Sequence, residues 1–233
     1  MTQTAIIIVA GGNGVRMGSE TPKQFLVLAG KPLLMHTIES FADALPKAKL
    51  IVVLPENQQT HWAALCEEYS FSIEHTIVTG GKNRFDSVKN GLKEATAFDY
   101  IGIHDGVRPL ARKELIVRTW EAAQNFGAAI PVIPLSDSIR EVIPCDSCAD
   151  FSEIIDSKPI DRNRFMAVQT PQFFREGLLL RAYEQDYEPE FTDDASVVEA
   201  AGSTITLVPG DPANIKITTP TDLVIAGALF DKK

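Results

Sequence analysis

The chain has 233 residues, of which 45% are apolar, enough for the core of one α/β domain or of one domain with an appendage. Its formal net charge is −9 at pH 7, which argues against binding to nucleic acid or to an anionic membrane through the overall field. We therefore expect no nucleic acid and no membrane among its partners. An anionic substrate would need a local basic pocket or a metal ion.

The first apolar run has no basic segment before it and is too short to span a bilayer, so we expect a cytoplasmic protein. Three cysteines cannot all pair with one another, which suits a reducing compartment. Cys145 and Cys148 form a C-x-x-C pair in a polar segment without a second pair of ligands. We interpret this pair as incidental, and a redox or zinc site is the alternative.

Apolar strands alternate with amphipathic helices through the first 135 residues. The first strand follows Thr4 and is broken by Gly11. The other expected strands span 50–54, 73–78, 100–104 and 128–133, and the expected helices span 32–44, 58–69, 84–95 and 112–125. This alternation predicts an α/β fold with a Rossmann-like, mostly parallel sheet and helices on both of its faces.

Residues 136–168 have no long helical period and contain short apolar pairs between polar residues and prolines. A segment of this length inside a compact domain is usually functional. We expect a projecting β-arm that contacts a partner, and a loop is the alternative. Helices at 174–185, 192–201 and 220–230, a strand at 205–208 and an extended segment at 214–217 complete a single domain over residues 1–233.

The loop after the first strand is rich in glycine, and Arg16 and Lys23 give it positive charge. It lacks the G-x-G-x-x-G fingerprint of dinucleotide-binding proteins and the Gly-Lys-Ser/Thr of the P-loop. It carries G-x-G-x-R-M and then P-K-Q instead. That combination resembles nucleotidyltransferases that activate sugars and sugar phosphates with a nucleoside triphosphate, and two solvated cations on a turn are the alternative.

Three further clusters lie where strands end, the edge at which α/β sheets bind ligands. T-G-G-K-N-R-F-D-S-V opens a helix, with an ordinary helix cap as the alternative. In I-G-I-H-D-G-V-R-P, Asp105 can hold Mg²⁺ or can pair with Arg108, while His104 is interpreted as structural. In N-I-K-I-T, Lys216 points away from its two isoleucine neighbours, either into the cleft or to solvent.

These blocks occur in one order with D-R-N, Q-T-P-Q-F-F and T-D-D-A-S. The ordered set resembles the 2-C-methyl-D-erythritol 4-phosphate cytidylyltransferases of the non-mevalonate isoprenoid pathway, over residues 6 to about 226. The chain departs from the family at Val9-Ala-Gly-Gly, where Pro-Ala-Ala-Gly is usual, and at Asp105-Gly-Val-Arg108, where Asp-Ala-Ala-Arg is frequent. These changes concern the fit of the nucleotide.

The resemblance implies a fold of the nucleotidyltransferase type and transfer of a cytidylyl group from CTP to 2-C-methyl-D-erythritol 4-phosphate, with release of pyrophosphate. It implies Mg²⁺, or another divalent cation, near Asp105. The roles that it implies are charge neutralisation by Arg16, Lys23 and Lys216, nucleotide binding by Ala10, Gly11, Gly12, Gly80, Gly81, Arg84 and Ser87, and acceptor binding by Asp105, Arg108, Ser138, Arg162 and Thr192.

The resemblance also implies a homodimer in which the arm is exchanged, so that Ser138 and Arg162 reach the acceptor phosphate in the partner's site. A ribitol 5-phosphate cytidylyltransferase on the same scaffold is the nearest alternative. A second alternative is a nucleotide-binding regulator without catalytic activity. Such a protein would be expected to lack the cationic residues, but Arg16, Lys23 and Lys216 are all present. An NAD-dependent oxidoreductase is a third, although no acidic residue ends the strand at 50–54.

Overall fold

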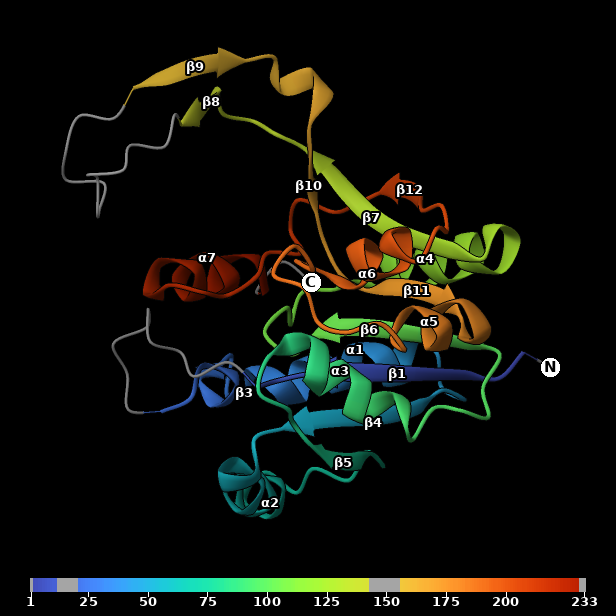
Figure 1. Ribbon diagram of the computed structural model, residues 1–233. Helices are drawn as coiled ribbons and strands as arrows, with labels where there is room; N and C mark the ends of the chain where they lie inside the picture. Colours follow the sequence, from blue (N-terminus) through green and yellow to red (C-terminus); the bar gives the residue numbers. More distant parts are fainter. Residues whose placement is uncertain (1, 12–20, 143–155, 231–233) are drawn as a thin grey trace.

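The computed structural model describes residues 2–11, 21–142 and 156–230 (Figure 1). An eight-stranded mixed sheet forms its centre, in the order β10-β7-β11-β6-β1-β4-β5, with β12 also paired to β7. The strands are β1 (Thr4–Val9), β4 (Lys49–Leu54), β5 (Thr76–Thr79), β6 (Tyr100–Asp105), β7 (Ala128–Pro134), β10 (Met166–Val168), β11 (Gln172–Arg175) and β12 (Thr206–Pro209).

Strand β1 lies in the middle of the parallel part of the sheet, paired with β4 on one side and with β6 on the other. Its side chains alternate between two cores: Ala5 and Ile7 face one, and Ile6 and Ile8 face the other. All four are fully buried. Burial on both faces requires a continuous apolar strand, which explains the I-I-I-V run and confirms the predicted parallel α/β sheet.

Helices cover both faces of this sheet, as predicted (Figure 1). Residues of α3, α5 and α6 pack in one core, and residues of α1, α2 and α4 pack in the other. The helices are α1 (Leu33–Ala44), α2 (Glu56–Glu68), α3 (Arg84–Leu92), α4 (Lys113–Phe126), α5 (Glu176–Ala182), α6 (Asp194–Ala200) and α7 (Pro220–Phe230). A third, smaller core joins α7 to β2 (Val27–Leu28), beside β3 (Lys31–Pro32) and a 3₁₀ turn at Lys23–Phe25.

Two local predictions were wrong. The helix expected at 174–185 begins only at Glu176, because residues 172–175 form β11, an antiparallel strand between β6 and β7. Phe173 and Phe174 are fully buried there on opposite faces of the sheet. The extended segment at 214–217 was also expected to form a short strand around Lys216, but no strand is assigned there, although the Ile217 N–H donates to the Val107 carbonyl at 2.9 Å.

Strands β8 (Ile139–Val142) and β9 (Ser157–Ile160) pair antiparallel and form a two-stranded sheet of their own. Figure 1 shows them away from the central sheet, beyond the end of β7. The side chain of Val142 in β8 is exposed, as are those of Phe165 and of Met166, the first residue of β10. Contact of this segment with a second subunit stays a prediction.

Candidate functional site

A pocket of about 450 Å³ opens at the carboxyl ends of β1, β5 and β6. It brings together residues from the glycine-rich loop and from the three clusters at strand ends. The predicted site residues that line it are Ala10, Gly11, Lys23, Gly80, Gly81, Arg84, Ser87, Asp105 and Lys216. Gly12, Arg16, Cys145 and Cys148 lie outside the described residues. The sequence thus predicted the edge of the sheet at which this pocket lies.

Asp105 ends β6 and stands among three cations. Its Oδ2 lies 3.1 Å from Lys216 Nζ and 3.1 Å from Arg108 Nε, and its Oδ1 lies 3.8 Å from Arg84 Nε. Burial opposes ionisation, but Lys216, Arg84 and Arg108 outweigh it, so the pKa of the Asp105 carboxyl lies well below its usual range. The pocket therefore contains a permanently ionised carboxylate and an excess of positive charge.

Lys216 points into the pocket, as one of the two alternatives predicted. Its amino group reaches Asp105 while Ile217 is fully buried on the other side of the segment. Arg108, expected on the acceptor side, is buried, and it donates to Asp105 and, at 2.8 Å, to the carbonyl of Asn214. Arg108 therefore ties the Lys216 segment to the end of β6.

His104 is structural, as interpreted from the sequence. It is fully buried, with Nδ1 2.9 Å from the hydroxyl of Thr170 and Nε2 3.3 Å from the carbonyl of Arg108. The Thr170 hydroxyl also accepts from the backbone N–H of Asp105 at 3.1 Å. Burial, helped by Arg108 and Lys216, lowers the pKa of His104 to about 3, so the ring is neutral and fixes the turn that carries Asp105.

Gly80 and Gly81 lead into α3, whose N-terminal end faces the pocket. The Asn83 side chain caps this helix by accepting from the N–H of Asp86. A Cβ on Gly81 would lie 2.2 Å from the Cβ of Asp86, so only glycine fits there. The Ser87 hydroxyl accepts from the N–H of Gly81 at 3.0 Å and donates to the Asn83 carbonyl at 2.8 Å. Ser87 therefore shapes the loop from within.

Arg84, the first residue of α3, makes a bidentate pair with Asp194, with distances of 2.9 Å and 2.6 Å. Asp194 was not predicted as a site residue, nor was Tyr183, whose hydroxyl donates to Asp194 Oδ1 at 2.7 Å. Gln24, which lines the pocket and donates to the Ala10 carbonyl at 2.8 Å, was not predicted either. Asp194 and Gln24 occur in quoted motifs, but no local pattern distinguishes them from their neighbours.

Three predicted acceptor residues lie elsewhere. Thr192, Ser138 and Arg162 are exposed and do not line the pocket of the described chain. Arg162 donates to the Ser136 carbonyl, at the base of the β8–β9 ribbon. Within one subunit these residues therefore do not join the other predicted groups.

No cluster of three or more metal-ligating side chains occurs among the described residues. Mg²⁺ in nucleotide-dependent enzymes needs only one or two carboxylates, because substrate phosphates and water supply the remaining oxygens. The ionised Asp105 at the pocket wall fits that sparse kind of site. Lys216 and Arg108 already contact its Oδ2, so a cation there would share or replace their contacts.

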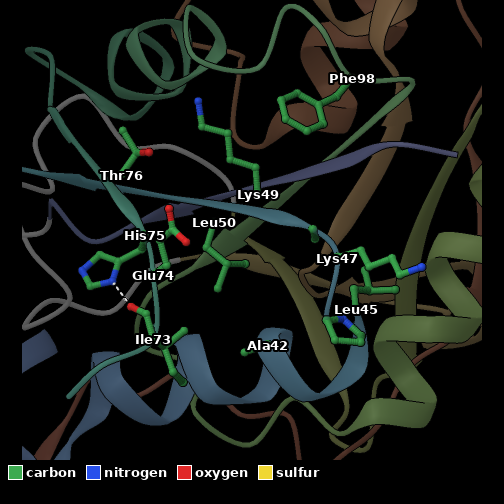
Figure 2. Close-up of a pocket in the computed structure, with 12 residues that line it drawn as sticks. Ala42, Leu45, Lys47, Lys49, Leu50, Ile73, Glu74, His75, Thr76 and Phe98 are labelled. Carbon is green, nitrogen blue, oxygen red and sulfur yellow. Dashed lines mark hydrogen bonds between the residues drawn. The ribbon is translucent and has the colours of Figure 1, made fainter. Parts of the chain in front are cut away.

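A second hollow, of about 430 Å³, opens at the amino ends of β4 and β5 (Figure 2). It contains none of the predicted site residues. His75 there is within 2.7 Å of the Ile73 carbonyl and accepts from Trp62 Nε1 at 3.0 Å, and Lys49 binds Glu94. The polar groups that bind one another in this hollow thus stabilise the fold.

Among the described helices, none is long and apolar enough to cross a membrane.

The sequence model of the family "2-C-methyl-D-erythritol 4-phosphate cytidylyltransferase" (IspD) matches residues 4–232. A protein of that name from Bacteroides fragilis is 50% identical over 99% of this chain and 100% of its own. A solved structure of that name from Thermus thermophilus is 31% identical, with a TM-score of 0.74 over 98% of both chains.

A structure of 4-diphosphocytidyl-2C-methyl-D-erythritol synthase from Anaerococcus prevotii, 25% identical, has a TM-score of 0.79 and covers 99% of this chain and 96% of its own. The matches run along almost the whole chain, both in sequence and in fold. This chain therefore belongs to the 2-C-methyl-D-erythritol 4-phosphate cytidylyltransferase family.

Proposed function

We propose that this protein transfers the cytidylyl group of CTP to 2-C-methyl-D-erythritol 4-phosphate and releases pyrophosphate. The observation that carries the proposal is the pocket at the carboxyl end of the sheet, where Lys23, Lys216 and Arg84 surround a glycine-lined hollow beside the ionised Asp105. Such a hollow suits a triphosphate, because cations and helix N-terminal N–H groups attract phosphate oxygens.

The chemistry requires little from the protein beyond alignment. A phosphate oxygen of the acceptor attacks the α-phosphorus of CTP, a new P–O bond forms, and the bond to the β-phosphate breaks. The attacking phosphate is already ionised at neutral pH, so no general base is needed. Lys23 and Lys216 hold the two anions together and offset the charge that develops at the α-phosphorus. We propose that Arg16 helps the two lysines to neutralise this developing charge.

Asp105 would hold Mg²⁺ together with oxygens of the triphosphate. The ion would supply charge neutralisation at the phosphates and orient the leaving pyrophosphate. Gly80, Gly81 and Arg84, which line the same pocket, would bind the cytidine end of CTP.

Pyrophosphate release tests the proposal. The purified protein is incubated with each of the four nucleoside triphosphates and with either 2-C-methyl-D-erythritol 4-phosphate or ribitol 5-phosphate. We expect release with CTP and the methylerythritol phosphate alone. Preference for ribitol 5-phosphate would replace the acceptor but keep the reaction, and no release with any pair would refute the transferase.

We further propose a homodimer whose β8–β9 ribbon completes the partner's site. Two observations support it. Ser138 and Arg162, the acceptor residues expected on the arm, do not line the pocket of their own subunit. The β8–β9 pair is a two-stranded ribbon, and such a ribbon alone is only marginally stable in water. The exposed apolar side chains of Val142, Phe165 and Met166 would be buried by such an exchange.

Mixed dimers test the shared site. An inactive Lys23→Ala protein and an inactive Arg162→Ala protein are mixed, allowed to exchange subunits and assayed. If Arg162 acts in the neighbouring site, a heterodimer carries both lesions in one site and leaves the other intact, so activity returns. A mixture that stays inactive, or a monomer by light scattering, would contradict the proposal.

A further inference from the structure

Asp194 is an acidic side chain with no access to solvent, on the first turn of α6. A buried carboxylate is costly unless it is paired and hydrogen-bonded. Both oxygens of Asp194 accept from the guanidinium of Arg84, and Oδ1 also accepts from the hydroxyl of Tyr183 at 2.7 Å. Burial, with Asp194 nearby, raises the pKa of Tyr183, so this hydroxyl stays protonated and keeps donating.

The pair fixes the plane of the Arg84 guanidinium, because two parallel N–H···O bonds leave little freedom to turn. Its Nε then lies 3.8 Å from Asp105 Oδ1, and the side chain, 29% exposed, lines the nucleotide pocket. A freed Arg84 would be attracted to Asp105 and would compete there with Lys216, whose Nζ lies 3.1 Å from Oδ2. Arg84 therefore makes its shorter, bidentate contact with Asp194 and only a longer one with Asp105.

Three elements meet at this contact. Arg84 opens α3, Asp194 opens α6, and Tyr183 ends α5. The ring of Phe85, next to Arg84, stacks on the ring of Tyr183 at 4.7 Å and 20°. Arg84 is thus held from behind by a packed contact of three elements, and its own side chain lines the pocket.

We propose that Asp194, supported by Tyr183, is a positioning residue that holds Arg84 in place for the nucleoside triphosphate. This inference rests on the proposed function, since it concerns the same pocket. It assigns a binding role to a side chain that contacts no substrate and lies outside the pocket wall.

The test measures CTP binding by calorimetry and steady-state kinetics for four proteins: the parent, Asp194→Asn, Arg84→Ala and the double variant. Asparagine keeps the volume and removes the charge. We expect Asp194→Asn to raise the Kd and KM for CTP about tenfold, and to leave the KM of the acceptor within about twofold. If Asp194 acts through Arg84, the double variant binds CTP no more weakly than Arg84→Ala alone.

A purely structural role for Asp194 predicts a lower melting temperature without a selective change in CTP binding. That result, or additive losses in the double variant, would overturn the proposal. If Asp194→Asn does not fold, Tyr183→Phe decides, because it removes one hydrogen bond to Asp194. We expect it to weaken CTP binding about threefold, while the matched Tyr100→Phe, which loses a hydroxyl bond to the Gln124 carbonyl at the other end of the sheet, leaves binding unchanged.

The measurement of CTP binding separates this inference from the proposed function. A parent that binds CTP but releases no pyrophosphate refutes the transferase, and the Kd comparison still decides the role of Asp194. A parent that binds no CTP overturns both. Equal Kd values for the parent and a folded Asp194→Asn overturn the positioning role alone.

Discussion

The two ends of the central sheet each carry a hollow of similar size, about 450 Å³ at the carboxyl end and about 430 Å³ at the amino end. They differ in what surrounds them. At the carboxyl end, Gly80 and Gly81 lead into the N-terminus of α3, and Lys23 and Lys216 add positive charge. At the amino end, Lys47 and Lys49 also line the hollow, but they lie with Glu74 and with residues from the C-terminal end of α1 rather than with a helix N-terminus (Figure 2).

The difference follows from the direction of the strands. In a parallel α/β sheet, helices begin where strands end, so their free N–H groups and the positive end of the dipole gather at the carboxyl edge. Free carbonyl groups gather at the amino edge, which repels phosphate. Neither the volume of a hollow nor the presence of lysines therefore determines its function, and the predictions below test whether the lysines matter where helices begin.

The largest effect is expected from the lysines of the carboxyl-end pocket. Lys216→Ala and Lys23→Ala should each lower turnover by a factor of about 10² or more, because each removes a preorganised charge beside the transferring phosphate. Lys49→Ala in the other hollow is the matched control and should leave turnover within about twofold, since the exposed Lys49–Glu94 pair contributes little. If turnover fell equally in all three variants, the carboxyl-end pocket would not be distinguished from the other hollow as the active site.

Asp105→Asn should weaken the dependence on Mg²⁺ and lower the free energy of unfolding by about 2 kcal/mol, because it leaves buried cations without their carboxylate. The loss is limited because Lys216 is 41% exposed and water can solvate its charge. A Mg²⁺ titration of turnover and urea unfolding at neutral pH measure the two effects. A Mg²⁺ titration that overlays that of the parent would make Asp105 a structural residue alone.

His104 should make the protein less stable in mild acid. Its pKa is lowered to about 3 in the folded protein and is about 6.5 when unfolded, so between these values only the unfolded chain holds the proton. Stability from this group is complete above pH 6.5 and falls by about 1.4 kcal/mol per pH unit below it. Urea unfolding of the parent and of His104→Gln from pH 7 to pH 5 should show the smaller slope in the variant, and parallel slopes would contradict the buried neutral ring.

The smallest effect is expected at Cys145 and Cys148. A Cys145→Ser, Cys148→Ser double variant should keep full turnover and should not differ from the parent in zinc content, because the sequence supplies no second pair of ligands. Pyrophosphate release and metal analysis of the two proteins measure this. One equivalent of zinc in the parent alone would show that the pair binds metal.

The sequence by itself determined the elements whose signal is local. The alternation of apolar strands, such as β1, with amphipathic helices depends only on near neighbours, and it predicted the fold class. The breaks at Gly80 and Gly81 and the position of Asp105 at a strand end predicted the edge of the sheet at which the pocket opens. The resemblance of the ordered motifs supplied the family.

Only the tertiary structure decided contacts between residues distant in sequence. Arg84 and Asp194 are 110 positions apart, and Arg108 and Asn214 are 106 apart, so their pairing depends on the order of the strands. Phe174 shows the same limit: its local pattern favours a helix, yet insertion of β11 between β6 and β7 makes it a strand residue. Periodicity reports which face of an element is apolar, whereas the sheet order determines what that face meets.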